Sequence, residues 1–227
     1  MTSEITVHYL EHSRGTRALW LLEELGVPYT IKAYKRNPKT QLAPPELKDI
    51  HPTGKSPLVV DKDGKVLAES GFICKYLIDK YGKGTELEPR NEQERNDIEY
   101  NLFAAESNFM TAGLALYIDH VAVQQAPTGF SFLLRRLFNV IESKYARPEM
   151  HLCLSLLNDQ ISKNGYIAAD HLTGGDIMYE NGIDFMKQLD PSLLDKYPAI
   201  LKWFNKVHER PAYKRAVARG VESVAKL

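Results

Sequence analysis

Residues 54–70 read GKSPLVVDKDGKVLAES and decide the fold class of this chain. Apolar segments at 57–60 and 66–68 flank a polar turn, in which Asp63-Gly64 supplies the positive φ angles that a tight hairpin needs. Residues 69–81 return to the period of a helix and stop before a glycine. The stretch therefore predicts a β-hairpin that leads directly into a helix.

The residues before this stretch predict a strand, a helix and a second strand. Apolar and polar side chains alternate from Ile5 to Tyr9, which is the period of a strand. Over residues 18–25 the apolar positions fall at i, i+3, i+4 and i+7, so they share one helical face. A second strand is expected at about 29–34 and a short helix at 47–50, after two prolines. The expected order is βαβ, then α, then ββα.

The second half of the chain shows helical patterns and no strand-like alternation. Long helices are expected over 91–123 and 130–145. Thr173-Gly174-Gly175-Asp176 has the pattern of a capping box at the start of a further helix. The sequence therefore predicts an α/β domain at 1–83 and an all-helical domain at 90–227.

Composition excludes several classes of protein. The chain has 227 residues, of which 44% are hydrophobic and 26% charged, close to the values of globular proteins. Lys+Arg and Asp+Glu are 29 each, so the formal charge is zero and nothing favours a nucleic-acid partner. No apolar run is long enough for a transmembrane segment, and residues 1–11 have no secretory pattern. We expect a cytoplasmic location, with peripheral membrane association left open.

The two cysteines indicate neither a disulfide framework nor a zinc site. Cys74 and Cys153 are far apart and no CxxC motif is present. Cys74 falls within a predicted helix and Cys153 within an apolar stretch, so both are interpreted as buried packing residues rather than nucleophiles.

Four stretches carry a resemblance to a known family: 12–15 (HSRG), 19–26 (LWLLEELG), 51–57 (HPTGKSP) and 68–73 (AESGFI). They resemble the cytosolic glutathione S-transferases, in particular the fungal subgroup typified by the yeast glutathione transferase I, and the likeness covers nearly the whole chain. The resemblance implies a thioredoxin-like α/β N-terminal domain that binds glutathione, followed by the all-α domain. It also implies conjugation of glutathione to small hydrophobic electrophiles, with roles in detoxification and stress response.

Ser13 is the residue that the resemblance implies for activation of the thiol. It lies where the first strand gives way to the first helix, and Ser13 and Arg17 keep the Ser-x-x-x-Arg spacing of serine-type transferases. A charge-assisted hydrogen bond is worth about 1.5–3 kcal/mol, which corresponds to roughly one to two pKa units on a bound thiol. Local sequence alone favours Ser13 as an N-cap, and the resemblance reverses that preference. Arg14 could stabilise a thiolate by its charge, and His12 is either a base or a surface residue.

Ser56 and Pro57 are the second element of the implied site. In the family the bond between them is cis, and the backbone before the proline pairs with the cysteinyl unit as an added strand. The alternative is an ordinary proline at the first residue of an edge strand, which would say nothing about a ligand. Lys55 is expected either to attract the carboxylates of the tripeptide or to be a solvated surface residue.

Glu69 and Ser70 are the third element. The γ-glutamyl end of glutathione carries an ammonium and a carboxylate. The glutamate side chain would bind the ammonium, and the helix N-terminus with the serine hydroxyl would bind the carboxylate. As an isolated pair they are only a good helix start. Lys39 or Gln41 is expected to meet the glycyl end, and the sequence does not decide between them.

The electrophile is expected between the two domains, against the first long helix of the second. Several apolar or amphipathic residues of this helix are candidates for the lining of the electrophile pocket, and Glu106 and Asn108 interrupt them. Most of these candidates are expected in the core or in a dimer interface. These candidates are Tyr100, Phe103, Phe109, Met110, Leu114 and Tyr117.

The resemblance implies glutathione as co-substrate, no metal or prosthetic group, and a symmetric homodimer. Two alternatives remain open at this stage. The same thiolate could reduce organic hydroperoxides, or the chain could be a noncatalytic transferase-like regulator or scaffold. The second alternative gives no reason for the set Ser13, Ser56-Pro57 and Glu69-Ser70 to be intact, so conjugation is favoured.

Overall fold

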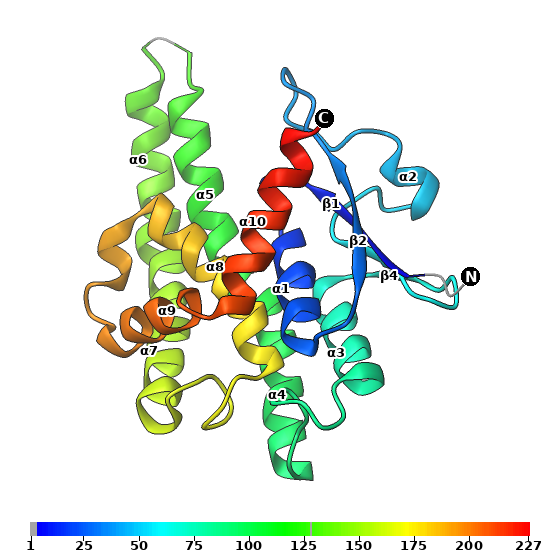
Figure 1. The fold of residues 1–227 in the computed structure, drawn as a ribbon. Helices are drawn as coiled ribbons and strands as arrows, with labels where there is room; N and C mark the ends of the chain where they lie inside the picture. The colour runs from blue at the N-terminus through cyan, green and yellow to red at the C-terminus, as the bar shows by residue number, and fades with distance from the viewer. Residues whose placement is uncertain (1–3, 128) are drawn as a thin grey trace.

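The computed structural model describes residues 4–127 and 129–227, and its N-terminal part has the predicted order of strands and helices (Figure 1). Residues 1–3 of the predicted first domain and residue 128 of the second lie outside the described residues. The N-terminal elements are β1 (Ile5–Leu10), α1 (Gly15–Leu25), β2 (Tyr29–Tyr34), α2 (Leu47–Ile50), β3 (Leu58–Val60), β4 (Val66–Ala68) and α3 (Ser70–Tyr81).

The four strands form one mixed sheet in the order β2-β1-β3-β4. β1 and β2 are parallel, as the connection through α1 requires, whereas β3 is antiparallel to both β1 and β4. Alternate side chains of β1 face opposite sides of the sheet. Val7 joins the large core that includes α1, while Leu10 contacts the smaller cluster around Leu47 of α2. Figure 1 shows α1 and α2 on opposite sides of the strands.

The rest of the described chain is helical. Its elements are α4 (Glu92–Ala104), the π-helical η1 (Ala105–Met110), α5 (Thr111–Gln124), α6 (Ser131–Ile141), the π-helical η2 (Glu142–Ala146), α7 (Arg147–Asn164), α8 (Gly174–Leu189), the 3₁₀ segment η3 (Pro191–Leu194), α9 (Pro198–His208) and α10 (Pro211–Ala225). The predicted α/β half followed by an all-helical half is confirmed.

The two predicted long helices are present, and the second is longer than expected. Residues 91–123 correspond to α4, η1 and α5 in direct succession, and residues 130–145 continue without a break into α7. The run passes beyond Tyr145 although Pro148 has no N–H to donate, and Pro148 lies just after the point where the π-helical η2 gives way to α7. No helix of the described residues combines the length and the apolar character needed to cross a membrane.

Helix α8 runs through the middle of the helical half and begins with the predicted capping box (Figure 1). The Thr173 hydroxyl accepts from the N–H of Gly175 (3.2 Å), and the Asp176 carboxylate accepts from the N–H of Thr173 (2.7 Å). Asp176 also accepts from the N–H of Ile167 (3.0 Å) and from the indole N–H of Trp203 (2.7 Å). Burial raises the pKa of Asp176 to about 6, and these hydrogen bonds oppose the rise.

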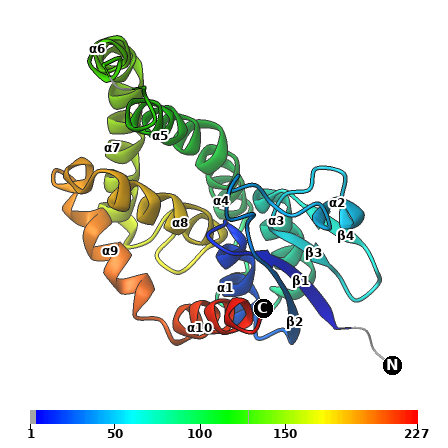
Figure 2. The same ribbon diagram turned by 90° about the horizontal axis from the view of Figure 1, so that it is seen from above.

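The last helix returns to the N-terminal half, where α10 packs along α1 (Figure 2). Arg219 of α10 donates to the Glu23 carboxylate (2.8 Å), and Arg210, at the start of the helix, pairs with Glu24 (2.6 Å) and Glu86 (2.7 Å). Because Glu23 and Glu24 belong to α1, these pairs hold the chain end against the first helix of the sheet layer.

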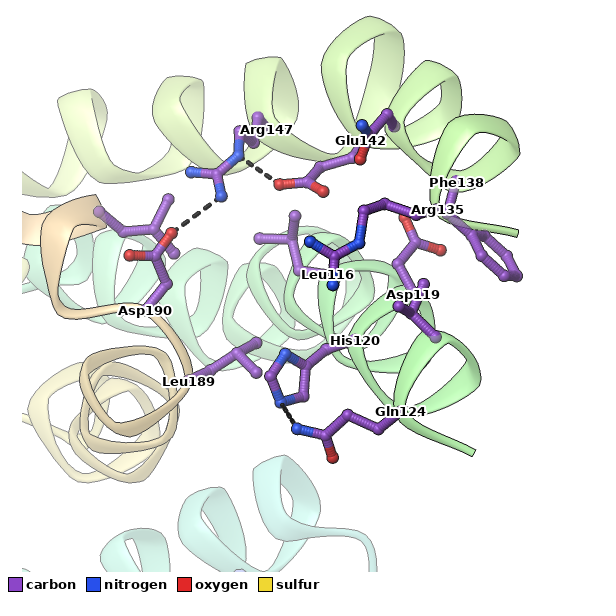
Figure 3. A pocket seen from close by; sticks show the side chains of 13 residues that line it. Leu116, Asp119, His120, Gln124, Arg135, Phe138, Glu142, Arg147, Leu189 and Asp190 are labelled. Carbon is purple, nitrogen blue, oxygen red and sulfur yellow. Dashed lines mark hydrogen bonds and ion pairs between the residues drawn. The ribbon is translucent and has the colours of Figure 1, made fainter. Parts of the chain in front are cut away.

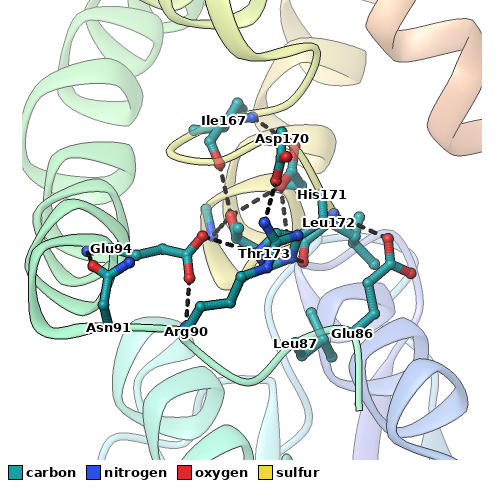
Figure 4. A network of polar contacts seen from close by, with 12 residues as sticks. Glu86, Leu87, Arg90, Asn91, Glu94, Ile167, Asp170, His171, Leu172 and Thr173 are labelled. Atoms are coloured by element: carbon teal, nitrogen blue, oxygen red, sulfur yellow. Dashed lines mark hydrogen bonds and ion pairs between the residues drawn. The ribbon is translucent and has the colours of Figure 1, made fainter.

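A polar network joins the chain between α3 and α4 to the loop before α8 (Figure 4). His171 Nε2 lies 2.9 Å from a Glu94 carboxylate oxygen, and Arg90 pairs with Asp170 at 2.7 Å. The N–H of Leu172 donates to the Glu86 carboxylate. The network therefore connects the segment between α3 and α4, which we call the linker, to the residues that precede the capping box.

We expect Asp176→Asn to lower the free energy of unfolding by about 2–4 kcal/mol. The neutral side chain accepts hydrogen bonds less well, and its NH₂ group would face buried N–H donors. The measurement is urea unfolding followed by circular dichroism. Asp184→Asn on the same helix is the control, since Asp184 bonds only the side chain of Gln188 in the described structure. Equal stability of the two variants would contradict the role given to Asp176.

Candidate functional site

Ser13 lies in the turn between β1 and α1, and its hydroxyl is engaged locally. It donates to the carbonyl of Leu10 (2.6 Å) and accepts from the N–H of Gly15 (3.1 Å). The Ser13 and Ser56 hydroxyl oxygens are 3.3 Å apart. The turn residue and the start of the hairpin, 43 residues further along the chain, are therefore brought together.

Ser56 joins the end of β1 to the start of β3. Its hydroxyl accepts from the N–H of Leu10 (3.1 Å) and donates to the carbonyl of His8 (3.1 Å). The bond between Ser56 and Pro57 is cis, as the family resemblance implies. Pro57 is buried, whereas the Lys55 side chain is exposed at the surface.

Glu69 has an unusual backbone conformation. Its φ of 71° and ψ of 121° lie in a region that residues other than glycine seldom adopt, and strain of this kind is typical of binding sites. The Glu69 side chain is exposed, and Ser70 is the half-buried first residue of α3. The free amide groups at the start of α3 are therefore presented beside a carboxylate and a hydroxyl.

A charged cluster lies next to the Ser13 turn. Arg17 is only 3% exposed, and both Arg17 and Arg14 form ion pairs with Glu106 of η1. Two guanidinium groups share the Glu106 carboxylate, so these three side chains together carry a net positive charge, while the Glu180 carboxylate also acts on Arg17. Burial lowers the pKa of Arg17, and Glu106 opposes that shift.

Arg17 also borders a small cavity that reaches the predicted ligand residues. The cavity has a volume of about 10 Å³, and Pro57, Ser70 and Cys74 line it together with Arg17. Within the described residues, the Nε and Nη2 atoms of Arg17 have no hydrogen-bond partner. A space of this size holds about one water molecule, which would satisfy these donors.

The loop that contains Lys39 and Gln41 is anchored by a residue that the sequence analysis missed. Arg36 donates to the carbonyl oxygens of Gln41 (2.9 Å) and His12 (3.1 Å). Lys39, Gln41 and His12 have exposed side chains. Arg36 therefore holds this loop against the Ser13 turn. A single arginine after a strand carries no local signal for such a role.

The candidates for the electrophile pocket separate into two groups. Phe109 is 1% exposed and packs edge-on against Tyr179 in the core, so it does not face a site between the two halves. Met110 is half-buried, and the other four candidates are 40–70% exposed: Tyr100, Phe103, Leu114 and Tyr117. Asn108 is also exposed.

Glu106, which the sequence analysis treated as an interruption of this apolar set, is the partner of both arginines. A lone acidic residue within an apolar helical stretch is the only sequence signal for that contact.

Cys74 is buried, and burial raises its pKa to about 12, so its thiol is a poor nucleophile. Cys153 is only half-buried but packs against the large core, so the expectation of a packing residue holds for both cysteines and that of full burial for Cys74 alone.

One group of side chains has atoms of the kind that bind metals. Ligand atoms of Glu94, Asp170 and His171 lie within 4.8 Å of one another. Each is already engaged by protein groups, because His171 meets Glu94 while Arg90 pairs with Asp170. The arrangement is explained by its structural role between the linker and the loop before α8.

Two family models match the chain. The model of the glutathione S-transferase N-terminal domain matches residues 5–79, and that of the C-terminal domain matches residues 126–211.

Two fungal relatives are 34% identical to this chain. Glutathione S-transferase 1 of Saccharomyces cerevisiae aligns over 92% of this chain and 92% of its own length. Glutathione S-transferase 3 of Schizosaccharomyces pombe aligns over 95% of this chain and 87% of its own length.

Solved structures share the fold. A glutathione S-transferase from Actinobacillus pleuropneumoniae is 29% identical with a TM-score of 0.76, covering 95% of this chain and 92% of that one. A glutathione transferase from Phanerochaete chrysosporium in complex with oxidized glutathione has a TM-score of 0.77 at 21% identity, covering 97% of both chains.

We expect Glu106→Gln to destabilise the protein by about 3 kcal/mol, because it leaves the buried Arg17 guanidinium without a counter-charge. The measurement is the free energy of unfolding in urea. Glu99→Gln is the control, since it removes a more exposed ion pair with Lys75 and should cost less than about 1 kcal/mol. A Glu106→Gln loss no larger than that of the control would show that Arg17 does not depend on Glu106.

Proposed function

This chain belongs to the glutathione S-transferase family, and we propose that it is an enzyme that conjugates the glutathione thiolate to small hydrophobic electrophiles. The observation that carries the proposal is the approach of the Ser13 and Ser56 hydroxyls to 3.3 Å at the end of β1. This approach joins Ser13, the proposed donor to the thiol sulfur, with the Ser56-Pro57 segment, which is proposed to pair with the cysteinyl backbone.

Ser13 is the proposed donor to the sulfur. Its hydroxyl hydrogen points to the Leu10 carbonyl at 2.6 Å, so donation to a thiolate requires rotation of the hydroxyl away from that carbonyl. The Gly15 N–H, which now donates to Ser13, stays in place and fixes the oxygen. A hydrogen bond to the charged sulfur lowers a thiol pKa of about 8.5 by roughly one to two units.

Arg14 and Arg17 are proposed to add long-range stabilisation. The net positive charge that they share with Glu106 lies beside the same turn and favours an anion there. Arg14 is nearly half exposed and already paired, so we assign it a supporting role after Ser13.

The γ-glutamyl end is proposed to bind at the start of α3. Its carboxylate would meet the Ser70 hydroxyl and the free amides of the first turn, and its ammonium would meet the Glu69 carboxylate. The strained Glu69 backbone supports this placement, because such a conformation is retained where it aims a side chain at a ligand. Lys55, which is exposed at the surface, is proposed to attract the carboxylates of glutathione.

The reaction itself needs little else from the protein. The thiolate attacks an electrophilic carbon, a carbon–sulfur bond forms and the leaving group departs with its electron pair. Holding both reactants in one cleft supplies an additional contribution through proximity. The exposed aromatic side chains Tyr100 and Phe103 of α4 are the proposed lining for the electrophile.

A homodimer is proposed because α6 has no buried residue in the described chain. Four apolar side chains of α6 are 57–75% exposed, namely Phe132, Leu133, Leu137 and Val140. A contiguous apolar surface of this kind is typical of a contact between subunits. A cytoplasmic location is proposed because the free thiols Cys74 and Cys153 suit a reducing compartment.

We expect the protein to be retained on immobilised glutathione and to conjugate glutathione to an aryl halide. The measurements are elution with free glutathione and turnover of an aryl halide and of an organic hydroperoxide. Retention without turnover of either substrate would favour a noncatalytic role. Turnover of the hydroperoxide alone would make the protein a peroxidase, and failure to bind would exclude the glutathione site.

We expect Ser13→Ala to retain most of the glutathione affinity and to raise the pKa of the bound thiol by about one to two units. The measurement is thiolate absorbance of the complex as a function of pH. Ser13→Thr, which keeps a hydroxyl, should restore the titration, and Ser107→Ala at an exposed serine is the control. An unchanged titration in Ser13→Ala would transfer the role to Arg14 or to a water molecule.

A further inference from the structure

A second cavity of about 350 Å³ lies within the helical half, open to solvent and lined by α5, α6, the η2–α7 segment and the junction of α8 with η3 (Figure 3). All thirteen lining residues come from positions 116–193, so neither the sheet nor α1–α3 contributes to it. Its volume is within the range of sites that hold small molecules. The glutathione site proposed above does not account for this cavity.

The wall of the cavity carries a buried carboxylate that lacks a partner. Asp119 of α5 is 7% exposed, and within the described residues its Oδ2 atom makes no hydrogen bond. Leaving a buried carboxylate oxygen unpaired is costly, and native proteins rarely do so without a ligand, a bound water molecule or a catalytic role. Burial raises the pKa of Asp119, and the nearby Glu142 raises it further.

The other charged groups around the cavity do not supply the missing cation. Arg147 is shared between Glu142 and Asp190, at 2.5 Å and 2.9 Å. Arg135 extends from α6 across the pocket in Figure 3, and it forms none of the ion pairs found among the described residues. The acidic residues of the wall outnumber the arginines, so the local charge favours a cation.

We propose that this cavity binds a small organic cation, an amine with an apolar body, whose ammonium group pairs with Asp119. The apolar body would lie against Leu116, Phe138, Leu189 and Leu193, which line the same space. An ammonium donates up to three hydrogen bonds and cancels the unpaired charge, so it meets both needs of the buried carboxylate.

A metal ion fits this cavity less well than an amine. Within the described residues, the group whose ligand atoms lie close enough to hold a metal is Glu94, Asp170 and His171, which does not include Asp119. The apolar side chains of the wall offer no ligand atoms and instead match a hydrocarbon body. An anionic ligand would place a second negative charge against Asp119.

The test is an NMR titration of the full-length protein with 2-phenylethylamine and with 2-phenylethanol, its neutral analogue of the same shape. We expect the amine to bind at least tenfold more tightly, with amide shifts concentrated at the ends of α5 and α8. Asp119→Asn should remove that preference and leave conjugation of glutathione unchanged. Asp159→Asn, at an exposed position of α7, is the matched control and should keep the preference.

Two further variants keep the test decisive if Asp119→Asn alters folding. Val123→Trp should fill the cavity and block the amine, while Arg135→Gln should tighten amine binding by removing a competing positive charge. Equal affinity for the amine and the alcohol, amine binding that survives Asp119→Asn, or shifts elsewhere in the protein would each overturn the proposal. Failure of the amine to bind, with loss of stability in Arg135→Gln, would identify Arg135 as the partner of Asp119 and overturn it too.

Discussion

The burial of the Arg17 guanidinium is the constraint on which the arrangement of the site depends. A buried charge without a counter-charge costs several kcal/mol, and α1 offers no acidic residue in its first turn. Glu106, 89 residues further along the chain, meets that requirement. Since Arg17 belongs to the first turns of α1, the contact holds η1 of the helical half against the turn that carries Ser13. The same carboxylate also holds Arg14, so one acidic residue determines both the position and the charge of the region next to the proposed thiolate.

The two π-helical segments explain how acidic residues reach these positions. Glu106 lies in the first turn of η1 and Glu142 is the first residue of η2, and each pairs with arginine. A π segment adds a residue to a helical turn and so shifts the phase of the helix that follows. For this reason the 3.6-residue period traced through 91–123 does not carry across η1. Phe109, which the sequence analysis considered as a pocket residue, instead enters the core.

The parts of the fold that the sequence predicted depend on chemistry within a few residues. The hairpin follows from the positive φ of Gly64, and the start of α8 follows from Thr173 and Asp176, which meet across a single turn. The bounds of β2, α2 and β4 were likewise predicted correctly because strand alternation and prolines act locally. The contacts that the sequence could not predict join distant segments: Arg17 with Glu106, and Arg36 with the carbonyl of His12. A single charged residue has no period, so its partner becomes visible only once the helices are packed.

Two buried aspartates of the helical half differ in how far the chain itself supplies hydrogen-bond donors to their carboxylates. Asp176 is fully buried and accepts hydrogen bonds from Ile167, Thr173 and Trp203, so its burial is compensated by groups of the chain itself. Asp119 is buried to a similar degree and lines a cavity, yet its buried Oδ2 atom has no partner among the described residues. A carboxylate that only stabilises the fold would be expected to be compensated as Asp176 is. The missing donor at Asp119 is therefore best supplied from outside the chain, and the space beside it is large enough to admit the molecule that carries that donor.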